Sequence, residues 1–266
     1  MSVSFNALEL SVATVLVLAS AGMSLALKLG MHRTMLVAAA RMVVQLLLIG
    51  LLLRSIFAMT NPWVTAGLIV LMVAAASYEV AARQERKLAG GWTFLVSGAA
   101  VSASTLFVSL IALGSVSVAQ DWTAPQVVIP IAGIVLGSSM NAASVGLAAL
   151  LDGVVAEREA IEARLALGHN KRQATQKLMQ RAARTGTINV TNQMAGAGII
   201  TLPGIMSGQV LAGQDPLIAA QSQIFLMLLL AAASTASIII AILLAQARLT
   251  DERDRLRLDR LNGMVG

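Results

Sequence analysis

The chain has 266 residues, of which 57% are hydrophobic and only 12% are charged. Soluble domains carry roughly 25% charged residues, so this composition excludes an ordinary water-soluble enzyme and indicates a chain surrounded mostly by lipid. The net charge is +6 and cysteine is absent, which excludes disulfides, thiolate metal sites and a catalytic thiol.

Seven apolar runs approach or exceed the roughly 20 residues that a helix needs to cross a bilayer. We therefore predict an all-α, polytopic protein of the inner or plasma membrane, forming a single transmembrane domain over residues 1–266. In chain order, the predicted spans cover residues 8–27, 35–57, 63–81, 92–113, 127–151, 187–210 and 217–244.

The basic residues predict how these spans are oriented. Lysine and arginine gather after the first, third, fifth and seventh spans, whereas the loops on the opposite side contain only Arg54. Basic loops stay in the cytosol, so we expect an outside N-terminus, a cytosolic loop over residues 152–186 and a cytosolic tail over residues 246–266. Because these bases lie between apolar runs, an orientation signal explains them better than binding of nucleic acid.

The second and third spans carry the first candidate functional residues. Arg41 and Gln45 are four residues apart and share one helix face. Arg41 either extends to the membrane interface or forms an inner gate, for instance opposite Glu79. Glu79 has an alternative partner in Arg83, four residues later. Acidic residues inside a membrane are functional candidates, so both readings of Glu79 stay open.

The fifth span has a stripe of helix-breaking and small residues that ends in an amide. Pro130, Gly133, Gly137 and Asn141 fall on one side of a helix, with serines adjacent. The glycines favour close helix packing, whereas Asn141 is a candidate for lining a polar path, because polar groups in a span rarely face lipid.

The loop over residues 152–186 is too charged to insert into lipid. Its apolar spacing predicts two short amphipathic helices broken at Gly168, His169 and Asn170, with Gly168 at positive φ. Such a helix–turn–helix either docks in the groove of a partner or remains a solvated connector resting on anionic headgroups.

The sixth span combines amides with a proline. Asn192 and Gln193 share a face with Asn189 and Gly196, and this face is the strongest candidate for a polar path or gate. Pro203 is expected to kink the helix by removing a backbone hydrogen bond. Gly204 and Gly208, four residues apart, are expected to admit another helix at close range.

Residues suited to a resident metal do not cluster in the sequence. His32 and His169 both fall in predicted cytosolic loops, and the thirteen methionines of a membrane chain are explained mostly by packing. Metal ligands therefore remain unknown, and no cofactor is expected on this chain.

Several stretches together resemble the FetB-type permease family of ABC transporters, which is linked to iron export and has a plant branch linked to aluminium tolerance. They are "ARMVVQLLLIG", "QVVIPIAGIVLG", "IEARLALGHNKRQA" and "GIITLPGIMSGQVLAGQDPLIAAQSQI", and the resemblance covers roughly residues 35–245.

This resemblance implies a permease whose segment "EARLALG" is the coupling helix, with Glu162, Ala163 and Gly168 matching the pattern and Arg164 replacing its second alanine. The chain contains no Gly-Lys pair and therefore no phosphate-binding loop. We therefore expect ATP and Mg to bind to a separate ATPase subunit, and we expect no catalytic residue on this chain. Paired ATPases predict a permease homodimer in a two-plus-two complex. An ATP-independent carrier or channel for a metal or small polar solute is the alternative.

Overall fold

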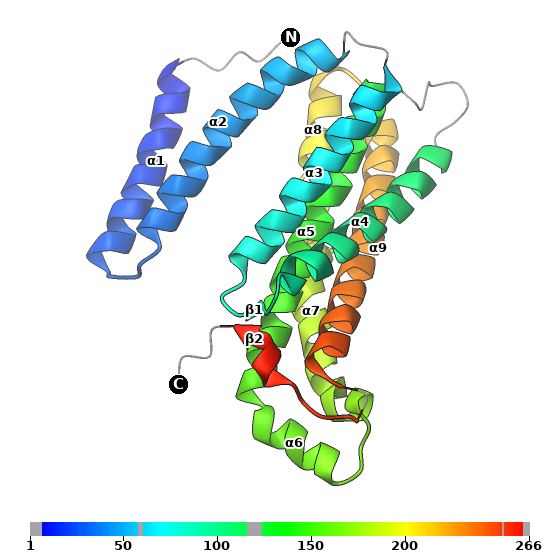
Figure 1. Ribbon diagram of the computed structural model, residues 1–266. Coiled ribbons are helices and arrows are strands. Elements are labelled where there is room, and N and C mark those ends of the chain that lie inside the picture. Colours follow the sequence, from blue (N-terminus) through cyan, green and yellow to red (C-terminus); the bar gives the residue numbers. More distant parts are fainter. Residues whose placement is uncertain (1–6, 58–60, 116–123, 252, 263–266) are drawn as a thin grey trace. The chain divides into compact units, whose positions relative to one another are not determined.

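The computed structural model describes residues 7–57, 61–115, 124–251 and 253–262, and the chain divides into two compact units, residues 1–61 and 62–266. Helices dominate both units (Figure 1). The expectation of an all-α protein is therefore correct, apart from one very short strand pair described below.

The first unit is a helical hairpin of α1 (Ala7–Ala26) and α2 (His32–Phe57). Its turn places Lys28 and Gly30 at positive φ, and the backbone N–H of Met31 donates to Ser24 Oγ at 3.1 Å. The apolar part of α2 is long enough to cross a bilayer, whereas that of α1 is slightly shorter, at residues Leu10–Ala26.

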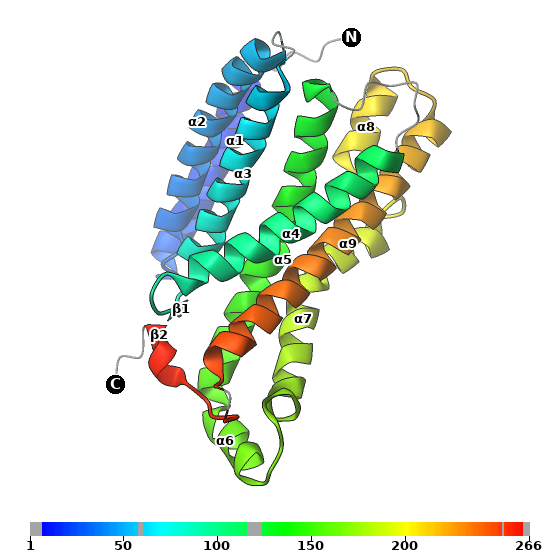
Figure 2. The same ribbon diagram turned by 45° about the vertical axis from the view of Figure 1, so that its right-hand side comes forward.

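The second unit is a helical bundle built around α5. Its helices are α3 (Pro62–Arg83), α4 (Trp92–Ser115), α5 (Pro125–Ala156), α6 (Arg158–Ala166), α7 (Lys171–Gly196), α8 (Gly204–Leu211) and α9 (Pro216–Leu249). The central α5 packs against α3, α4, α7 and α9, and Figure 2 shows α4 crossing in front of it. We call the end of the bundle that carries α6 the basic end.

Local signals in the sequence explain where these helices begin. Proline occupies the first position of both α5 and α9, where its missing N–H leaves no helical bond unmade. Asp215 caps α9 by accepting from the N–H groups of Leu217 and Ile218, as its position before Pro216 suggests.

Two apolar clusters hold the bundle together. The cluster nearer the basic end surrounds α5 at Leu147 and Leu150 and includes Leu178 of α7. The other cluster joins α5 at Val135, α7 at Val190 and α9 at Ala233. Together with α4, which contributes Val101 to the first cluster and Val108 to the second, these three helices share both clusters, and α7 is an integral part of the bundle.

Glycines allow α5, α7 and α9 to cross at close range. A Cβ atom on Gly186 of α7 would lie 2.8 Å from the Ala142 carbonyl oxygen of α5, closer than real Cβ atoms approach. A Cβ atom on Gly146 of α5 would collide with the Ile238 side chain of α9. The sequence-based prediction assigned close approach to other glycines and missed these two.

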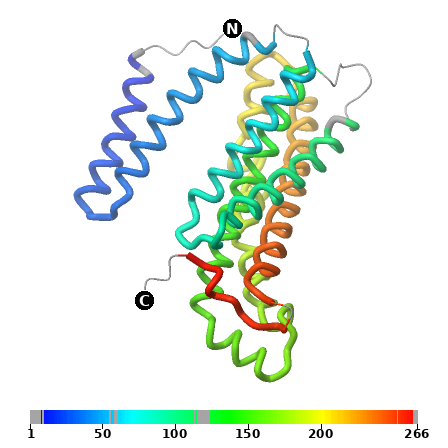
Figure 3. The backbone as a smooth tube through the Cα atoms, viewed as in Figure 1, coloured from blue at the N-terminus to red at the C-terminus, as the bar shows by residue number. Residues whose placement is uncertain are grey.

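The C-terminal segment folds back over the basic end, as Figure 3 shows. It passes through a short 3-10 helix, η1 (Leu258–Arg260), into β2 (Leu261–Asn262), which pairs antiparallel with β1 (Lys87–Leu88). Leu258 and Leu261 are buried in the cluster nearer the basic end. Residues 253–262 are therefore packed against the bundle, and α9 continues to Leu249, past the predicted end of the seventh span.

The seven predicted spans are confirmed in part. Within the described residues, five helical stretches are long and apolar enough to cross a membrane, and they belong to α2, α3, α4, α5 and α9. The predicted sixth span is two helices, because the chain leaves helical geometry between Gly196 and Gly204. The predicted second short helix of the loop is also wrong, since α7 runs unbroken from Lys171 to Gly196.

Candidate functional site

A row of amides is exposed on α7. Asn189, Asn192 and Gln193 are all exposed, and Gln193 Nε2 donates to Asn189 Oδ1 at 3.4 Å. Their neighbour Val190 points the other way and is only 6% exposed. The predicted common face therefore exists, and among its described residues the second unit leaves this face exposed.

This polar face lies at the depth of the apolar helices. Val190 packs with Val135 and Ala233, which belong to the membrane-length helices α5 and α9. Polar side chains at such a depth face protein or water rather than lipid. The open face of α7 therefore requires either a water-filled path or another protein surface beside it.

The helix breaks directly after this face. Gly198 has a φ of +82°, and its N–H donates to the Thr201 carbonyl oxygen at 2.9 Å, which closes a tight turn. Ile199 and Ile200 in this turn are 92% and 81% exposed. Non-helical backbone at membrane depth is tolerated only where it is buried in protein or lines a water-filled cavity, so this turn belongs to the same candidate region as the amide face.

Pro203 does not kink a continuous helix, contrary to the prediction. It is the N-cap of α8, with φ −60° and ψ 145°, so the helix has already ended before the proline is reached. The break begins at Ala197 because Gly198 adopts a left-handed conformation that ends the helix. Proline then starts α8 at a position where no N–H is needed.

Gly204 and Gly208 do not pack closely against another helix of this chain. A Cβ atom on either glycine would meet nothing within 4 Å among the described residues. The close approaches in the bundle are at Gly146 and Gly186 instead. The interior Thr185-Gly186-Thr187 sequence of α7 was the available signal, because glycine inside a helix is otherwise unfavourable.

The side of α5 that carries Gly137 and Asn141 is only partly covered. Gly137 is exposed and Asn141 is half-buried, so this side of α5 is also incompletely covered by the second unit. The adjacent serine has a packing role, since Ser138 Oγ lies 2.7 Å from Ser234 Oγ of α9. Asn141 therefore remains available to line a path, while Ser138 joins two helices.

The candidate gate residues lie in both units. Arg41 and Gln45 are exposed side chains of α2 in the first unit. Glu79 belongs to α3 in the second unit, where Arg83 Nη2 is 3.2 Å from its Oε1. The ion pair predicted from their spacing is confirmed.

The α6 helix is anchored on one side and open on the other. Ile161 is fully buried, whereas Glu162 and Ala163 are exposed, and Leu167 is 80% exposed at the tip. Glu162 accepts from Arg158 Nε at 2.9 Å. An exposed leucine beside small and acidic residues suits docking against a partner groove.

The turn after α6 has the expected glycine conformation. Gly168 has a φ of +88°, as predicted, and a Cβ atom there would meet nothing within 4 Å. Asn170 and Gln173 form a reciprocal capping box that starts α7. The spacing of these two residues was a readable signal for a helix start that the sequence-based prediction did not use.

Arg164, which stands in place of the second alanine of the permease pattern, has a structural role. Its Nη1 donates to the Ala174 carbonyl oxygen of α7 at 2.9 Å, so the guanidinium braces the hairpin of α6 and α7. The arginine therefore supports the hairpin without occupying its exposed surface at Ala163 and Leu167.

A metal centre is not evident in the described part of the chain. No three histidine, aspartate or glutamate side chains there lie close enough to hold a metal ion. The oxygen atoms near the break belong to amides, hydroxyls and backbone carbonyls.

Comparison with known proteins gives one family match. The model of an uncharacterised protein family, UPF0014, matches residues 7–250. No solved structure matches the chain significantly.

Three curated relatives show how far the similarity extends. UPF0014 membrane protein slr1647 of Synechocystis is 35% identical over 72% of this chain and 73% of its own length. UPF0014 membrane protein YjkA of Bacillus subtilis is 31% identical over 83% of this chain and 86% of its own. The protein named "Probable iron export permease protein FetB" of Escherichia coli is 28% identical over 95% of each chain.

The family model covers most of the chain, and the relatives are named as membrane proteins or as a permease. Together with the five apolar helices, this shows a multi-pass membrane protein. The chain belongs to the UPF0014 family.

Proposed function

We propose that this chain is the membrane-spanning permease subunit of an ABC transporter that exports iron or a related metal. A separate cytosolic ATPase subunit supplies the energy, and ATP and Mg bind to that partner. The observation that carries the proposal is the exposed amide face of α7, which lies beside apolar helices and is followed by a break in the helix.

The geometry of α7 suits transport better than a structural role. A helix that served only to fill the bundle would bury its polar groups or replace them with apolar ones. Here Asn192 and Gln193 are exposed at a depth where lipid is unfavourable for amides. Broken helices with polar surfaces are how many transporters build a path at the membrane centre.

A second copy of the chain completes this path. ATPases that bind ATP between two subunits act as pairs, and each permease chain offers a single α6 hairpin for docking. Two permease chains and two ATPase chains therefore form the complex, and the open faces of the two α7 helices enclose the path. The proposed path and gate residues are Arg41, Gln45, Glu79, Asn141, Asn192, Gln193 and Pro203.

The α6 hairpin transmits the conformational change. Glu162, Ala163 and Gly168 form the ATPase contact, and α7 connects this contact directly to the amide face because it is one continuous helix. A movement of the docked hairpin is thereby passed along α7 to the break at Gly198. This continuity supports coupling better than two short loop helices would.

The metal is the cargo of the path. Iron export is proposed from the name of the Escherichia coli relative, which is similar along almost the whole chain. Amide and carbonyl oxygens are weak, exchangeable ligands for such a cation, which suits passage better than storage.

Reconstitution tests the proposal. The chain and its partner ATPase are placed together in liposomes, and ATP hydrolysis is measured with ferrous iron, ferric iron, aluminium and a non-metal solute. Stimulation by iron, with ATP-dependent movement of iron across the membrane, is the expected result. Transport of iron without any ATPase would support an ATP-independent carrier or channel instead.

A further inference from the structure

The C-terminal segment forms a basic pocket at the basic end of the second unit. This pocket of about 620 Å³ is lined by five basic side chains and one carboxylate, Asp251. We name the basic side chains the basic tail cluster. They are Lys171, Arg253, Arg255, Arg257 and Arg260.

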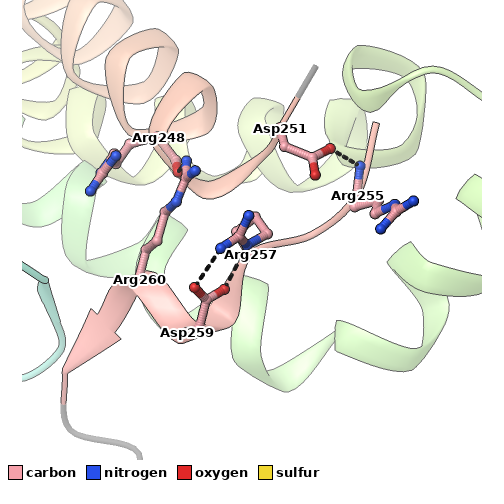
Figure 4. Close-up of polar contacts among 6 residues, drawn as sticks. All are labelled: Arg248, Asp251, Arg255, Arg257, Asp259 and Arg260. Atoms are coloured by element: carbon pink, nitrogen blue, oxygen red, sulfur yellow. Dashed lines mark hydrogen bonds and ion pairs between the residues drawn. The ribbon is translucent and has the colours of Figure 1, made fainter. Parts of the chain in front are cut away.

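Part of this charge is already compensated within the chain. Arg257 makes two hydrogen bonds to Asp259, at 2.8 and 2.9 Å, as Figure 4 shows. Asp251 Oδ1 accepts from the backbone N–H groups of Arg253 and Arg255, at 3.0 and 2.8 Å. These amides, that of Arg255 most strongly, lower the pKa of Asp251.

The guanidinium groups of Arg253 and Arg255 are placed to meet an anion. Both residues are exposed, and their hydrogen bonds to Asp251 use backbone N–H groups rather than the side chains. Glu252, directly before Arg253, lies outside the described residues. Asp254, between the two arginines, accepts from the backbone N–H of Lys171. An anionic group in this pocket would meet several donors without breaking the ion pair between Arg257 and Asp259.

An apolar groove adjoins the basic tail cluster. It has a volume of about 460 Å³ and is lined mainly by apolar side chains of α4 and α9, together with Arg248 and Arg260. Ala247 and Arg260 line both the groove and the basic pocket, so the two lie next to each other. The apolar part of the lining consists of Trp92, Leu95, Val96, Ala99, Leu244 and Ala247.

The junction of groove and pocket has the chemistry of a membrane interface. The Arg248 guanidinium carbon lies 4.6 Å from the centre of the Trp92 ring, in a cation–π contact. Tryptophan and arginine at the end of a span favour the level of the lipid headgroups. Figure 4 shows Arg260 reaching from η1 toward α9, where its Nη1 donates to the Arg248 carbonyl oxygen at 2.8 Å.

An unsatisfied donor also lies at this junction. Arg248 Nε is buried and has no hydrogen-bond partner in the described part of the chain. A buried donor without a partner is unfavourable, and an acceptor oxygen from a bound group would satisfy it. The groove supplies space for such a group directly beside Arg248.

We propose that the basic tail cluster and the adjoining groove bind an anionic phospholipid of the inner leaflet, with the phosphate among the arginines and an acyl chain against Trp92 and Leu244. The location rests on the predicted orientation, which places the basic end in the cytosol, where anionic lipids attract basic segments. The site does not depend on the transported solute.

The site is also placed to influence the α6 hairpin. Lys171 begins α7, its backbone N–H donates to Asp254 Oδ1 at 3.3 Å, and its Nζ donates to the Asp251 carbonyl oxygen at 3.3 Å. A lipid that orders the C-terminal segment would therefore also steady the turn between α6 and α7.

Native mass spectrometry of the purified full-length chain tests this proposal. The protein is titrated with dioleoylphosphatidylglycerol and, separately, with dioleoylphosphatidylcholine, which has the same chains and a neutral headgroup. We expect the anionic lipid to bind at least tenfold more tightly. Equal binding of both lipids would overturn the proposal.

Charge-reducing variants localise the binding. Replacing Arg253 and Arg255 together with glutamine is expected to weaken binding of the anionic lipid about 25-fold, since each basic residue near an anionic surface contributes about fivefold. Arg184→Gln, an exposed arginine of α7 outside the pocket, is the matched control and should bind normally. An unchanged affinity in the double variant would refute the assignment.

Two further measurements test whether the site binds a lipid. Arg248→Lys should bind the lipid more tightly than Arg248→Gln, because it keeps the charge at the mouth of the groove, and equal losses would contradict a role for that charge. Inorganic phosphate is titrated as a competitor to separate a lipid site from a free anion site. Displacement of the lipid at equal phosphate concentration would identify a free anion site and overturn the proposal.

Discussion

Replacing Gly186 with alanine would perturb a point where α7 lies against the backbone of α5. The new Cβ atom would lie 2.8 Å from the Ala142 carbonyl oxygen and 2.9 Å from Ile238 Cγ1. A side-chain end such as Ile238 can rotate away, but the backbone oxygen of Ala142 moves only if a helix moves. The variant therefore forces α7 and α5 apart.

The expected change in the free energy of unfolding follows from two opposing contributions. Overpacking of a well-packed interior destabilises by about 1–3 kcal/mol. Alanine is favoured over glycine inside a helix by about 1 kcal/mol, which partly offsets this loss. Gly137 is also helical, but a Cβ atom there meets nothing within 4 Å, so Gly137→Ala has only the favourable term. The free energy of unfolding of Gly186→Ala should therefore be about 1–3 kcal/mol lower than that of Gly137→Ala.

Unfolding by titration with a denaturing detergent, followed by tryptophan fluorescence, measures this difference. Both variants are compared with the unmodified chain in the same micelles. A Gly186→Ala variant as stable as Gly137→Ala would refute the close crossing. Destabilisation of Gly137→Ala alone would mean that another surface covers α5 at Gly137.

Three further predictions concern the proposed path and its coupling. Gly168→Val should abolish binding of the ATPase, because valine is unfavourable at a φ of +88°, whereas the Gly168→Asn variant should still bind it. Equal binding of the ATPase by both variants in a pull-down would contradict the docking assignment. Asn192→Leu should lower transport in liposomes at least tenfold while the protein still folds and assembles. The control variant Asn192→Gln should retain most of the transport activity. Full transport by the leucine variant would exclude Asn192 from the path. Pro203→Ala removes the locked φ at the start of α8 and should lower transport with assembly intact, since a bias of about 1.4 kcal/mol between two conformations shifts their ratio tenfold. Unmodified transport in this variant would assign the proline to architecture alone.

Sequence reasoning succeeded where one local signal decides the outcome. The apolar runs identified the helices because lipid-facing segments must be apolar regardless of their neighbours. Gly168 was placed at positive φ because a glycine between two helices relieves backbone strain locally. The common face of Asn189, Asn192 and Gln193 followed from helix periodicity and needed no tertiary contact.

The sixth span shows where this reasoning failed. The apolar run at residues 198–211 was extended backward into one helix, although Gly198 and Pro203 mark both ends of a break. The charged segment before it was predicted to be a separate short helix of the cytosolic loop. In the bundle it is continuous with the helix that follows, and Leu178 and Val190 of this one helix pack into the two apolar clusters.

The amino-acid sequence alone determined that this protein crosses a membrane, which stretches are apolar enough to do so, and which amides share a helix face. These properties depend on composition and on the 3.6-residue helix period, so they can be read before folding is considered. Only the tertiary structure decided that no described part of the second unit covers the amide face, and that Gly186 rather than Gly204 permits close approach. It also decided that Arg248 lies over Trp92 and that Arg260 reaches the end of α9. Each of these depends on which segments distant in the sequence come into contact, and contacts of that kind follow from the packing of the whole bundle rather than from any local pattern.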